Sequence, residues 1–370
     1  MNISKSNVTF SSIVSIGEKV KAASERESVE YLALNRGVNA VTTIDLTRAI
    51  SRIDPNSFQY QVYAPNSGMS SLKYAIKNEY FPSAPGYTTD NITIMPGGMP
   101  GLDLIIQTLD VEHIVFPKFY WGSYSKMATI RGKQYEFYDD ILTMDHTKYN
   151  SNHCIFICDP NNPTGIKVDD NDLYYKIRQI SETGAIVVFD SPYRKMFNFD
   201  KDDLNLFNSI YRLPNVIICE SFSKSLGVSG ARLGFIYCGD KEFNKELAIR
   251  TLYEFNGVCT PSQLLVHELL TSSKYDVEQF KRITRNNIVE NIDYLSDRDL
   301  LAQEIYKGDV PFGMFAIVNI SEDDLFKHKI GAVGLDKFVV VDKDKYCKYS
   351  RICLSVPSDK FKTFFDNVRV

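Results

Sequence analysis

Short continuous runs of apolar residues recur along most of this chain, and each is bounded by Gly, Pro, Asn or Asp. From about residue 42 to residue 270 these runs alternate with helix-like segments. Runs of this kind are typical of strands that are buried on both faces of a mostly parallel sheet. They lie at residues 92–94, 114–116, 154–158, 185–189 and 216–219. The alternation predicts an α/β architecture.

The two ends of the chain follow a different pattern. Residues 13–27 predict a helix, and residues 31–34 predict a short strand that ends before Gly37. After residue 273 the pattern predicts a long charged helix over 275–295 and then strands at 314–318 and 338–341. We therefore expect a large domain over residues 42–274 and a smaller α+β domain over residues 275–370. No linker is rich in Pro or Ser, so the two parts should share a firm interface with a cleft between them.

Composition and charge exclude several classes of protein. Hydrophobic residues make up 44% of the 370 residues and charged residues 24%, which is ordinary for a soluble globular protein. The net charge is −4 and no basic block is present, so nucleic acid is not an expected partner. No apolar run approaches the roughly 20 residues that span a bilayer, and the first residues lack the apolar stretch of a signal peptide. We expect a cytoplasmic protein that does not enter a membrane.

The seven cysteines and five histidines carry no pattern of a metal site. Cys154, Cys158, Cys219 and Cys238 fall in strand-like runs, and no Cys-x-x-Cys pair is present. Reduced, buried thiols are the expected state of these residues in a cytoplasmic protein. We expect no bound metal.

The segment Ser221–Gly234 carries the most specific chemistry in the chain. It places the amine of Lys224 between the hydroxyls of Ser223 and Ser225, adds glycines, and ends near the guanidinium of Arg232. These groups are suited to holding an aldehyde cofactor as a Schiff base and to anchoring its phosphate. Taken alone, the segment also fits a strand followed by a Gly-rich loop with an incidental lysine.

The other candidate residues also follow strand-like runs. Asp190 comes directly after residues 185–189, and Asn162 lies in the Asn-Asn-Pro-Thr-Gly sequence after residues 154–158. Ligands of a mostly parallel sheet bind at the carboxyl ends of its strands, so these side chains should meet there. Taken singly, Asp190 also fits a helix N-cap and Asn162 a tight turn.

The motifs together resemble those of the class I and II aminotransferases, an aspartate aminotransferase-like family of fold type I that uses pyridoxal 5′-phosphate. The family pattern of Ser-x-Ser-Lys, a spacer and Gly-x-Arg-x-Gly is filled at every position, and the resemblance runs along nearly the whole chain. It implies a large domain with a seven-stranded, mostly parallel sheet covered by helices. It also implies that residues 1–41 join the smaller domain.

The resemblance implies roles for three catalytic residues. Lys224 would hold the cofactor as a Schiff base and move the proton of the substrate α-carbon. Asp190, in an Asp-x-x-Tyr pattern with Tyr193, would bind the pyridine nitrogen. Tyr193 and Asn162 would both donate to the 3′-oxygen of the cofactor.

It also implies how the rest of the cofactor is bound. The amides of Gly98 and Met99, at the start of a predicted helix, would face the phosphate, because free amides and the helix dipole favour anions. The remaining phosphate and cofactor ligands would be Ser221, Ser223 and Arg232. Trp121, the only tryptophan, would stack on the ring, with Tyr120 and Phe119 as alternatives and an aromatic core cluster as the rival interpretation.

The expected substrate contacts complete this picture. Arg351 would bind the substrate carboxylate as a bidentate partner, and Gly37 and Asn162 would lie beside the substrate; otherwise Arg351 is a surface residue of an edge strand. Tyr63 would reach the phosphate of a neighbouring subunit, which makes the protein a homodimer with a shared site, unless it is only a loop aromatic. Further candidates for the side-chain pocket are Lys118, Phe119, Tyr120, Arg36 and Asn256.

The resemblance implies transfer of an α-amino group from a free amino acid to a 2-oxo acid. The same groups would also serve a lyase or a cyclodehydratase that eliminates from an arginine-type amino acid and closes a ring. A non-catalytic, ligand-binding relative is a more distant alternative. An NAD-binding protein is disfavoured, because no G-x-G-x-x-G sequence follows the first strand-like run.

Overall fold

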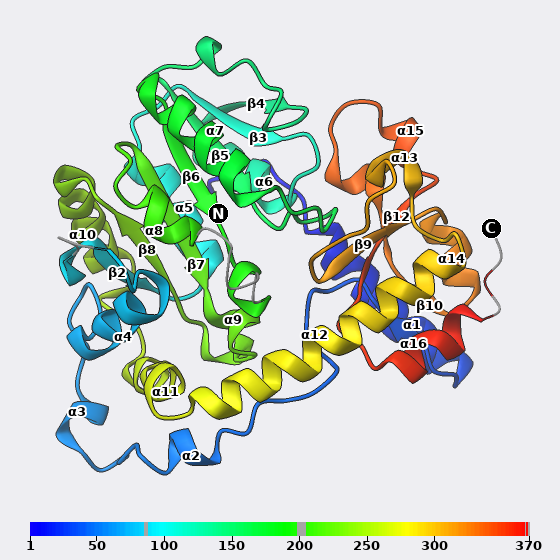
Figure 1. Cartoon of the computed structure of the whole chain (residues 1–370), viewed down its shortest axis with the longest axis horizontal. Helices are drawn as coiled ribbons and strands as arrows, with labels where there is room; N and C mark the ends of the chain where they lie inside the picture. The colour runs from blue at the N-terminus through cyan, green and yellow to red at the C-terminus, as the bar shows by residue number, and fades with distance from the viewer. Residues whose placement is uncertain (85–87, 198–204, 367, 369–370) are drawn as a thin grey trace.

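The computed structural model describes residues 1–84, 88–197, 205–366 and 368 (Figure 1). Its centre is a sheet of seven strands. Neighbouring strands within this sheet are, in order, β2 (Ile92–Met95), β8 (Gly234–Cys238), β7 (Val216–Ser221), β6 (Ile186–Asp190), β5 (His153–Cys158), β3 (His113–Pro117) and β4 (Gln134–Tyr138). All neighbours pair in parallel except those of β8, which is antiparallel to both β2 and β7. The predicted fold class, with its mostly parallel seven-stranded sheet, is confirmed.

Each face of this sheet carries its own apolar core, because successive side chains of a strand point to opposite faces. On β5, Ile155 and Ile157 belong to one core, and Cys154 and Phe156 belong to the other. The first face is covered by α4 (Ser70–Tyr80), α7 (Asp170–Glu182), α8 (Leu206–Ile210) and α11 (Thr260–Thr271). The second face is covered by α5 (Gly98–Thr108), α6 (Ser123–Ile130) and α10 (Lys241–Phe255). Burial on both sides explains why these strands have continuous apolar sequences.

A second group of strands lies beside the large sheet and is called the small-sheet unit here (Figure 1). It contains the parallel pair β1 (Leu32–Ala33) and β10 (Ile330–Gly331), and the antiparallel strands β11 (Val333–Gly334), β12 (Ser350–Cys353) and β9 (Phe315–Val318). The helices of the unit are α1 (Ser12–Glu27), α14 (Glu322–Lys327) and α16 (Ser358–Phe365). The long helix α12 (Lys274–Asp297) runs from the large sheet to this unit (Figure 1).

Short helices occupy the connections. They are α2 (Thr47–Ile50), α3 (Phe58–Gln61), α9 (Phe222–Ser225), α13 (Gln303–Tyr306) and α15 (Lys343–Tyr346). Turns of 3-10 helix are η1 (Thr89–Asn91), η2 (His146–Lys148), η3 (Arg194–Met196), η4 (Ser229–Ala231) and η5 (Leu335–Phe338).

Most of the predicted elements are confirmed, and one is wrong. The helix over 13–27 is α1, and the long charged helix is α12. The strand predicted at 338–341 is absent: η5 ends at Phe338, and the side chains of Val340 and Val341 are largely exposed. A run of β-branched residues forms a strand only where a partner strand is available. Among the described residues this segment pairs with no strand, although Phe338 and Val339 are buried. The domain boundaries at residues 41 and 274 stay a prediction.

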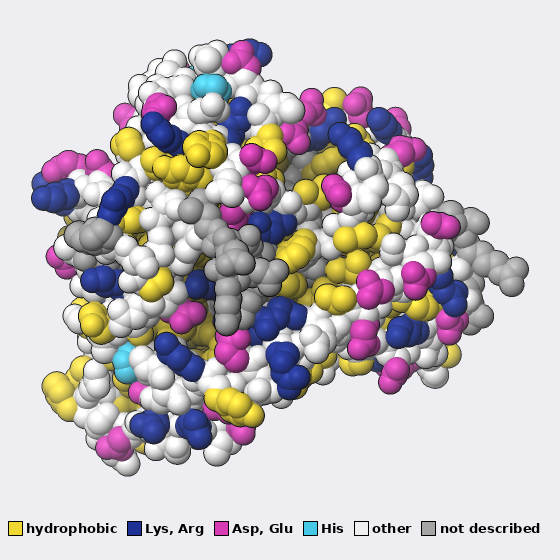
Figure 2. Space-filling view, viewed as in Figure 1, with side chains coloured by type: hydrophobic (Ala, Val, Ile, Leu, Met, Phe, Trp, Pro, Cys, Tyr) yellow, Lys and Arg dark blue, Asp and Glu magenta, His cyan; other side chains and the backbone are white. Residues whose placement is uncertain are grey.

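The described surface carries charged side chains of both signs. Figure 2 shows basic and acidic side chains interspersed on one face, as a net charge of −4 suggests. Among the described residues, no helix is both long and apolar enough to cross a bilayer. All seven cysteines are free thiols, and the four in β5, β7 and β8 are buried, as predicted.

Candidate active site

A cavity of about 450 Å³ lies between the large sheet and the small-sheet unit. From the large sheet it receives the ends of β6 and β7 and the short helix α9, and from the small-sheet unit it receives β9, β12 and the loop after β1. Of the residues that the sequence assigns to the site, those that line it are Gly37, Gly98, Met99, Trp121, Asn162, Asp190, Tyr193, Ser221, Ser223, Lys224, Arg232 and Arg351. Tyr63 does not line it, and its side chain is 85% exposed.

Lys224 projects into the cavity from α9, which begins immediately after β7. The hydroxyl of Ser221 caps this helix by accepting a hydrogen bond from the amide of Ser223 at 3.3 Å. The half-buried Lys224 amine donates a hydrogen bond to the carbonyl oxygen of Gly37, in the small-sheet unit. Burial lowers the pKa of this amine below its usual value, and the cations Arg351 and Arg232 act in the same direction.

Asp190 ends β6 and is buried in the cavity wall. Burial raises the pKa of its carboxyl group to about 7, and a hydrogen bond from the hydroxyl of Tyr124 opposes this rise. Tyr124 is not among the residues predicted from the sequence. Its signal was available, because it lies three residues after Trp121, and a turn joins the two: the Tyr124 amide donates to the Trp121 carbonyl oxygen at 2.9 Å.

Asn162, Tyr193 and Arg351 form a chain of hydrogen bonds across the cavity. The Asn162 amide donates to the Tyr193 hydroxyl at 3.2 Å, and the Asn162 carbonyl accepts from Arg351 Nη1 at 3.2 Å. Arg351 comes from β12 and lies between the rings of Phe315 and Phe338, with its Cζ 4.4 Å and 4.9 Å from the two centroids. It is buried, and not the edge-strand surface residue of the rival interpretation.

The Arg351 guanidinium has unused hydrogen-bonding capacity. Its Nη2 donates to the carbonyl oxygen of Asn35, but its Nε is buried and has no hydrogen-bond partner among the described residues. Burial lowers the pKa of Arg351 to about 10, so the group is still a cation at neutral pH. A buried cation with a spare donor is suited to binding a carboxylate.

A second basic part of the cavity is formed by the backbone of two glycines, the hydroxyl of Ser221 and the guanidinium of Arg232. The helix α5 begins at Gly98, as predicted, and Gly97 before it has a φ of +104°. A Cβ at Gly97 would lie 2.8 Å from Arg232 Nη2, and a Cβ at Gly98 would lie 3.2 Å from the Cβ of Ser221. The two glycines therefore let a helix N-terminus approach both side chains closely, which makes a cradle for an anion.

The structure distinguishes among the three aromatic residues predicted as candidates for stacking on the cofactor ring. Trp121 lines the cavity, and its ring meets that of Tyr124 edge to face at 5.6 Å. Tyr120 and Phe119 do not line it: the Tyr120 hydroxyl lies 3.1 Å from Ser125 Oγ, and the Phe119 ring packs against Tyr346. Trp121 is therefore the only one of the three that is placed to touch a ligand.

Comparison with known proteins identifies the family. The model of the aminotransferase class I and II family matches residues 31–363. The chain belongs to the class I and II aminotransferases. This aminotransferase is accordingly a transferase that depends on pyridoxal 5′-phosphate, as the lysine motif predicted.

Several relatives and solved structures are similar to this aminotransferase. It is 25% identical to a histidinol-phosphate aminotransferase of Methanococcus aeolicus over 67% of this chain and 70% of that protein. It is 30% identical to histidinol-phosphate aminotransferase 1 of Haemophilus influenzae over 41% of this chain and 44% of that one. The aspartate aminotransferase of Thermus thermophilus, solved with maleate, superposes with a TM-score of 0.83 over 99% of this chain and 98% of that chain at 17% identity. The structural likeness confirms the fold.

The residues of the cavity fit the cofactor of the family. A phosphorylated pyridine aldehyde requires an amine, a carboxyl group for its ring nitrogen and an anion cradle. The cavity brings together the amine of Lys224, the buried carboxyl of Asp190 and the cradle at Gly97, Gly98 and Arg232. Because a Cβ at Gly97 would fill the cradle, its backbone suits an anion that needs close approach.

The additional pocket residues suggested by the sequence divide into two groups. Arg36 lines the cavity. Lys118 does not, and its amine instead pairs with Asp139 at 2.9 Å. Asn256 also lies outside the lining and ends α10 in a left-handed conformation, with a φ of 48°. Lys118 and Asn256 are therefore not among the residues that line the cavity, because an ion pair holds the first elsewhere and the end of a helix holds the second.

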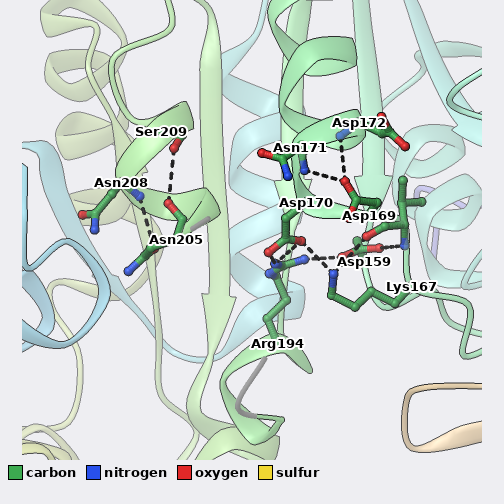
Figure 3. Close-up of polar contacts among 11 residues, drawn as sticks. Asp159, Lys167, Asp169, Asp170, Asn171, Asp172, Arg194, Asn205, Asn208 and Ser209 are labelled. Atoms are coloured by element: carbon green, nitrogen blue, oxygen red, sulfur yellow. Dashed lines mark hydrogen bonds and ion pairs between the residues drawn. The ribbon is translucent and has the colours of Figure 1, made fainter. Parts of the chain in front are cut away.

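A buried ion network is centred on Arg194, the residue that follows Tyr193 in the sequence (Figure 3). Arg194, next to Tyr193, donates to Asp159, and its Nη2 lies 2.6 Å from both carboxylate oxygens of Asp170. Asp159 precedes the loop of Asn162, and its carboxylate also accepts from the amide of Val168 at 2.8 Å. Burial raises the pKa of Asp159, and Arg194 opposes this rise. The network joins the loops after β5 and β6.

Proposed function

We propose that this aminotransferase moves the α-amino group of a free amino acid to a 2-oxo acid, with Lys224 as the catalytic amine. The observation that carries this proposal is the convergence of four groups on one cavity. These are the Lys224 amine, the Asp190 carboxyl, and the guanidinium groups of Arg232 and Arg351. Each comes from a different element, so their meeting depends on the whole fold.

The cofactor residues follow from the same convergence. When bound, pyridoxal 5′-phosphate supplies an aldehyde that condenses with amines and a ring that stabilises negative charge at the α-carbon of an amino acid. Lys224 would hold the aldehyde, and Asp190, oriented by Tyr124, would hold the ring nitrogen. The remaining contacts would come from Trp121 at the ring face, Asn162 and Tyr193 at the ring oxygen, and Gly98, Met99, Ser221, Ser223 and Arg232 at the phosphate.

The chain's own groups then bind the substrate and move the proton. Arg351 would bind the α-carboxylate through its free Nε and an adjacent nitrogen, and Asn162 and Gly37 would border the substrate. Burial lowers the pKa of Lys224 and so favours its neutral amine, the form that can take the proton from the α-carbon and return it. Its hydrogen bond to Gly37 keeps it at the junction of the two units.

The proposal is tested by trapping the cofactor. Reduction of the enzyme with sodium borohydride should attach pyridoxal phosphate to the peptide that contains Lys224, as read by mass spectrometry. Lys224→Ala should abolish this adduct and lower the rate of amino transfer by at least about 10³-fold, because it removes both the attachment point and the proton carrier. Retention of the adduct at wild-type level in this variant would show that another lysine serves.

The reaction type is tested by the products. A panel of amino acids, with L-histidinol phosphate included because of the named relatives, should give oxo products and convert the cofactor to its amine form. Loss of water or ammonia without an oxo product would instead favour the hypothesis of a lyase or cyclodehydratase. Binding of ligands with no turnover would favour a non-catalytic relative.

The homodimer is part of this proposal. Phe58 and Tyr63 are 84% and 85% exposed and lie on one segment around α3, at the edge of the molecule (Figure 1). Large exposed aromatic side chains that gather on one segment are typical of an interface. Tyr63 on this segment would reach the phosphate cradle of the second subunit. The seven free thiols suit the reducing cytoplasm, which is the proposed compartment.

A further inference from the structure

Arg36 is a cation of the cavity that none of these roles uses. Its side chain is exposed, lines the cavity, and makes no hydrogen bond or ion pair with any residue that the structure describes. Most exposed arginines are solvated surface charges, so the position of this one has to be argued from its surroundings.

The backbone around Arg36 is held from both sides by residues of the site. The carbonyl oxygen of Asn35, before it, accepts a hydrogen bond from Arg351. The carbonyl oxygen of Gly37, after it, accepts one from Lys224. The Arg36 carbonyl itself accepts from the amide of Val38 at 3.0 Å. The Cα of Arg36 is therefore fixed between the groups proposed to bind the carboxylate and to move the proton, although its guanidinium has no partner among the described residues.

The helix α1 has a gap where the Arg36 side chain lies. Gly17 is in the interior of α1, where glycine costs about 0.5–1 kcal/mol relative to alanine. A Cβ at this position would lie 2.9 Å from Asn35 Nδ2 and 3.7 Å from Arg36 Nε. Asn35 is in turn tied to α1, because its Nδ2 donates to the carbonyl oxygen of Ile13 at 2.8 Å. Gly17 thus admits Asn35 and lets the Arg36 side chain pack against the helix at the cavity edge.

The charges of the cavity leave one cation without a ligand. The described lining contains the cations Arg36, Lys224, Arg232 and Arg351, and its only carboxyl group is Asp190. Under the proposed function Lys224 and Arg232 serve the cofactor, and Arg351 serves the α-carboxylate. Arg36 then faces the remaining space, and apart from Asp190 no carboxyl group of the described residues lines the cavity with it. A substrate with a neutral side chain leaves this charge unused, whereas one with a second anionic group satisfies it.

We propose that Arg36 forms a subsite for a second, distal anionic group of the amino-acid substrate, either a carboxylate or a phosphate-type group. A guanidinium binds both through paired N–H donors, so one residue suits either chemistry. This inference rests on the proposed function, since it takes the α-carboxylate to lie on Arg351.

The test compares substrates of one chain length that differ only in distal charge. L-Glutamate carries a carboxylate, L-2-amino-4-phosphonobutyrate carries a phosphonate, and L-glutamine is the neutral match. The wild-type enzyme should favour at least one anionic member over glutamine by about tenfold or more in kcat/KM, as expected for a charge-assisted contact. Arg36→Gln should reduce this ratio to about twofold or less while leaving kcat/KM for glutamine nearly unchanged. The anionic substrate that loses most identifies the chemistry of the subsite.

Three controls make the result specific. Lys21→Gln removes an exposed positive charge from α1 outside the cavity, so it should keep the wild-type ratio. Arg36→Lys should retain part of the preference, and thermal unfolding should show that all variants are folded. A wild-type enzyme with no anionic preference, or an Arg36→Gln enzyme that keeps it, would overturn the proposal.

A binding measurement separates this inference from the proposed function. Calorimetry should show that glutarate binds the wild-type holoenzyme about tenfold more tightly than butyrate, and that Arg36→Gln equalises the two. If this difference is found but no amino group is transferred, the subsite stands and the proposed reaction fails. If transfer occurs and glutarate binds no better than butyrate, the reaction stands and the subsite fails.

Discussion

At the scale of single residues, the environment of each group decides its chemistry. Asp190 and Lys224 have opposite charges, yet burial acts against the charged form of both. It raises the pKa of the Asp190 carboxyl to about 7 and lowers that of the Lys224 amine. A carboxyl with a raised pKa readily shares a proton with a ring nitrogen, and an amine with a lowered pKa can accept one from carbon. Tyr124 adds orientation by donating to Asp190.

The raised pKa of Asp190 predicts a pH-dependent stability of the cofactor-free enzyme. The folded carboxyl has a pKa of about 7, whereas an unfolded aspartate has about 3.9. Between about pH 4 and pH 7 the folded state therefore binds more protons at this carboxyl than the unfolded state does. The stabilisation of the folded state by this proton is complete below about pH 4 and is lost as the pH rises through about 7. The excess free energy of unfolding of wild type over Asp190→Asn should fall by about 2–3 kcal/mol from pH 5 to pH 8.

Denaturant titrations at several pH values measure this difference. Asp293→Asn, which removes an exposed carboxyl on α12, is the matched control for the loss of a carboxyl group. A difference for Asp190→Asn that rises with pH, or stays flat, would contradict the assigned environment.

At the scale of elements, buried ion pairs connect the loops that follow two of the parallel strands. The loop after β5 carries Asn162, and the segment after β6 carries Tyr193 and leads into η3. Arg194 in η3 joins them through the buried carboxylates of Asp159 and Asp170. The two residues proposed as cofactor donors are thereby fixed relative to one another, which is what a 3.2 Å contact between Asn162 and Tyr193 requires.

Removal of the shared cation should therefore be costly. Arg194→Met leaves two buried carboxylates without their guanidinium, and breaking a buried pair from one side costs about 3–5 kcal/mol. Chemical denaturation should show this loss, and cofactor affinity should weaken with it. The control Arg178→Met breaks an exposed pair with Glu182 on α7 and should leave stability unchanged within error. Equal stability of the two variants would show that the network contributes little.

At the scale of the whole molecule, the cavity exists because two units meet. Lys224 and Asp190 belong to the large sheet, whereas Arg351 and Gly37 belong to the small-sheet unit. The hydrogen bond from Lys224 to Gly37 and the bond from Arg351 to Asn162 both cross this junction. In the proposed dimer, the exposed aromatic side chains around α3 would bring a second copy of the chain to this site.

The proposed dimer predicts a specific sensitivity at this segment. Sedimentation should show the wild-type enzyme as a dimer at micromolar concentration. Replacing both Phe58 and Tyr63 by Asp should shift it toward monomer, because two charges would then be buried at the interface. Tyr175→Asp, a change at an exposed tyrosine on α7, should leave the dimer intact. A monomeric wild type, or equal dissociation of the control, would contradict the prediction.

The sequence by itself determined the strand pattern, the fold class and the family. It could do so because burial on both faces of a sheet leaves continuous apolar runs, and because the groups at Lys224 and Asp190 follow such runs directly. It could not place the strand-like run at 338–341, because only a partner strand decides whether such a run pairs.

Only the tertiary structure decided which polar groups face one another across the junction. Tyr124 meets Asp190 from another element, Arg194 meets Asp159 from a neighbouring loop, and Arg36 faces the cavity while Lys118 turns to Asp139. These contacts join residues far apart in the chain and follow no local periodicity. Their energies depend on burial and distance, and both are set when the two units pack together.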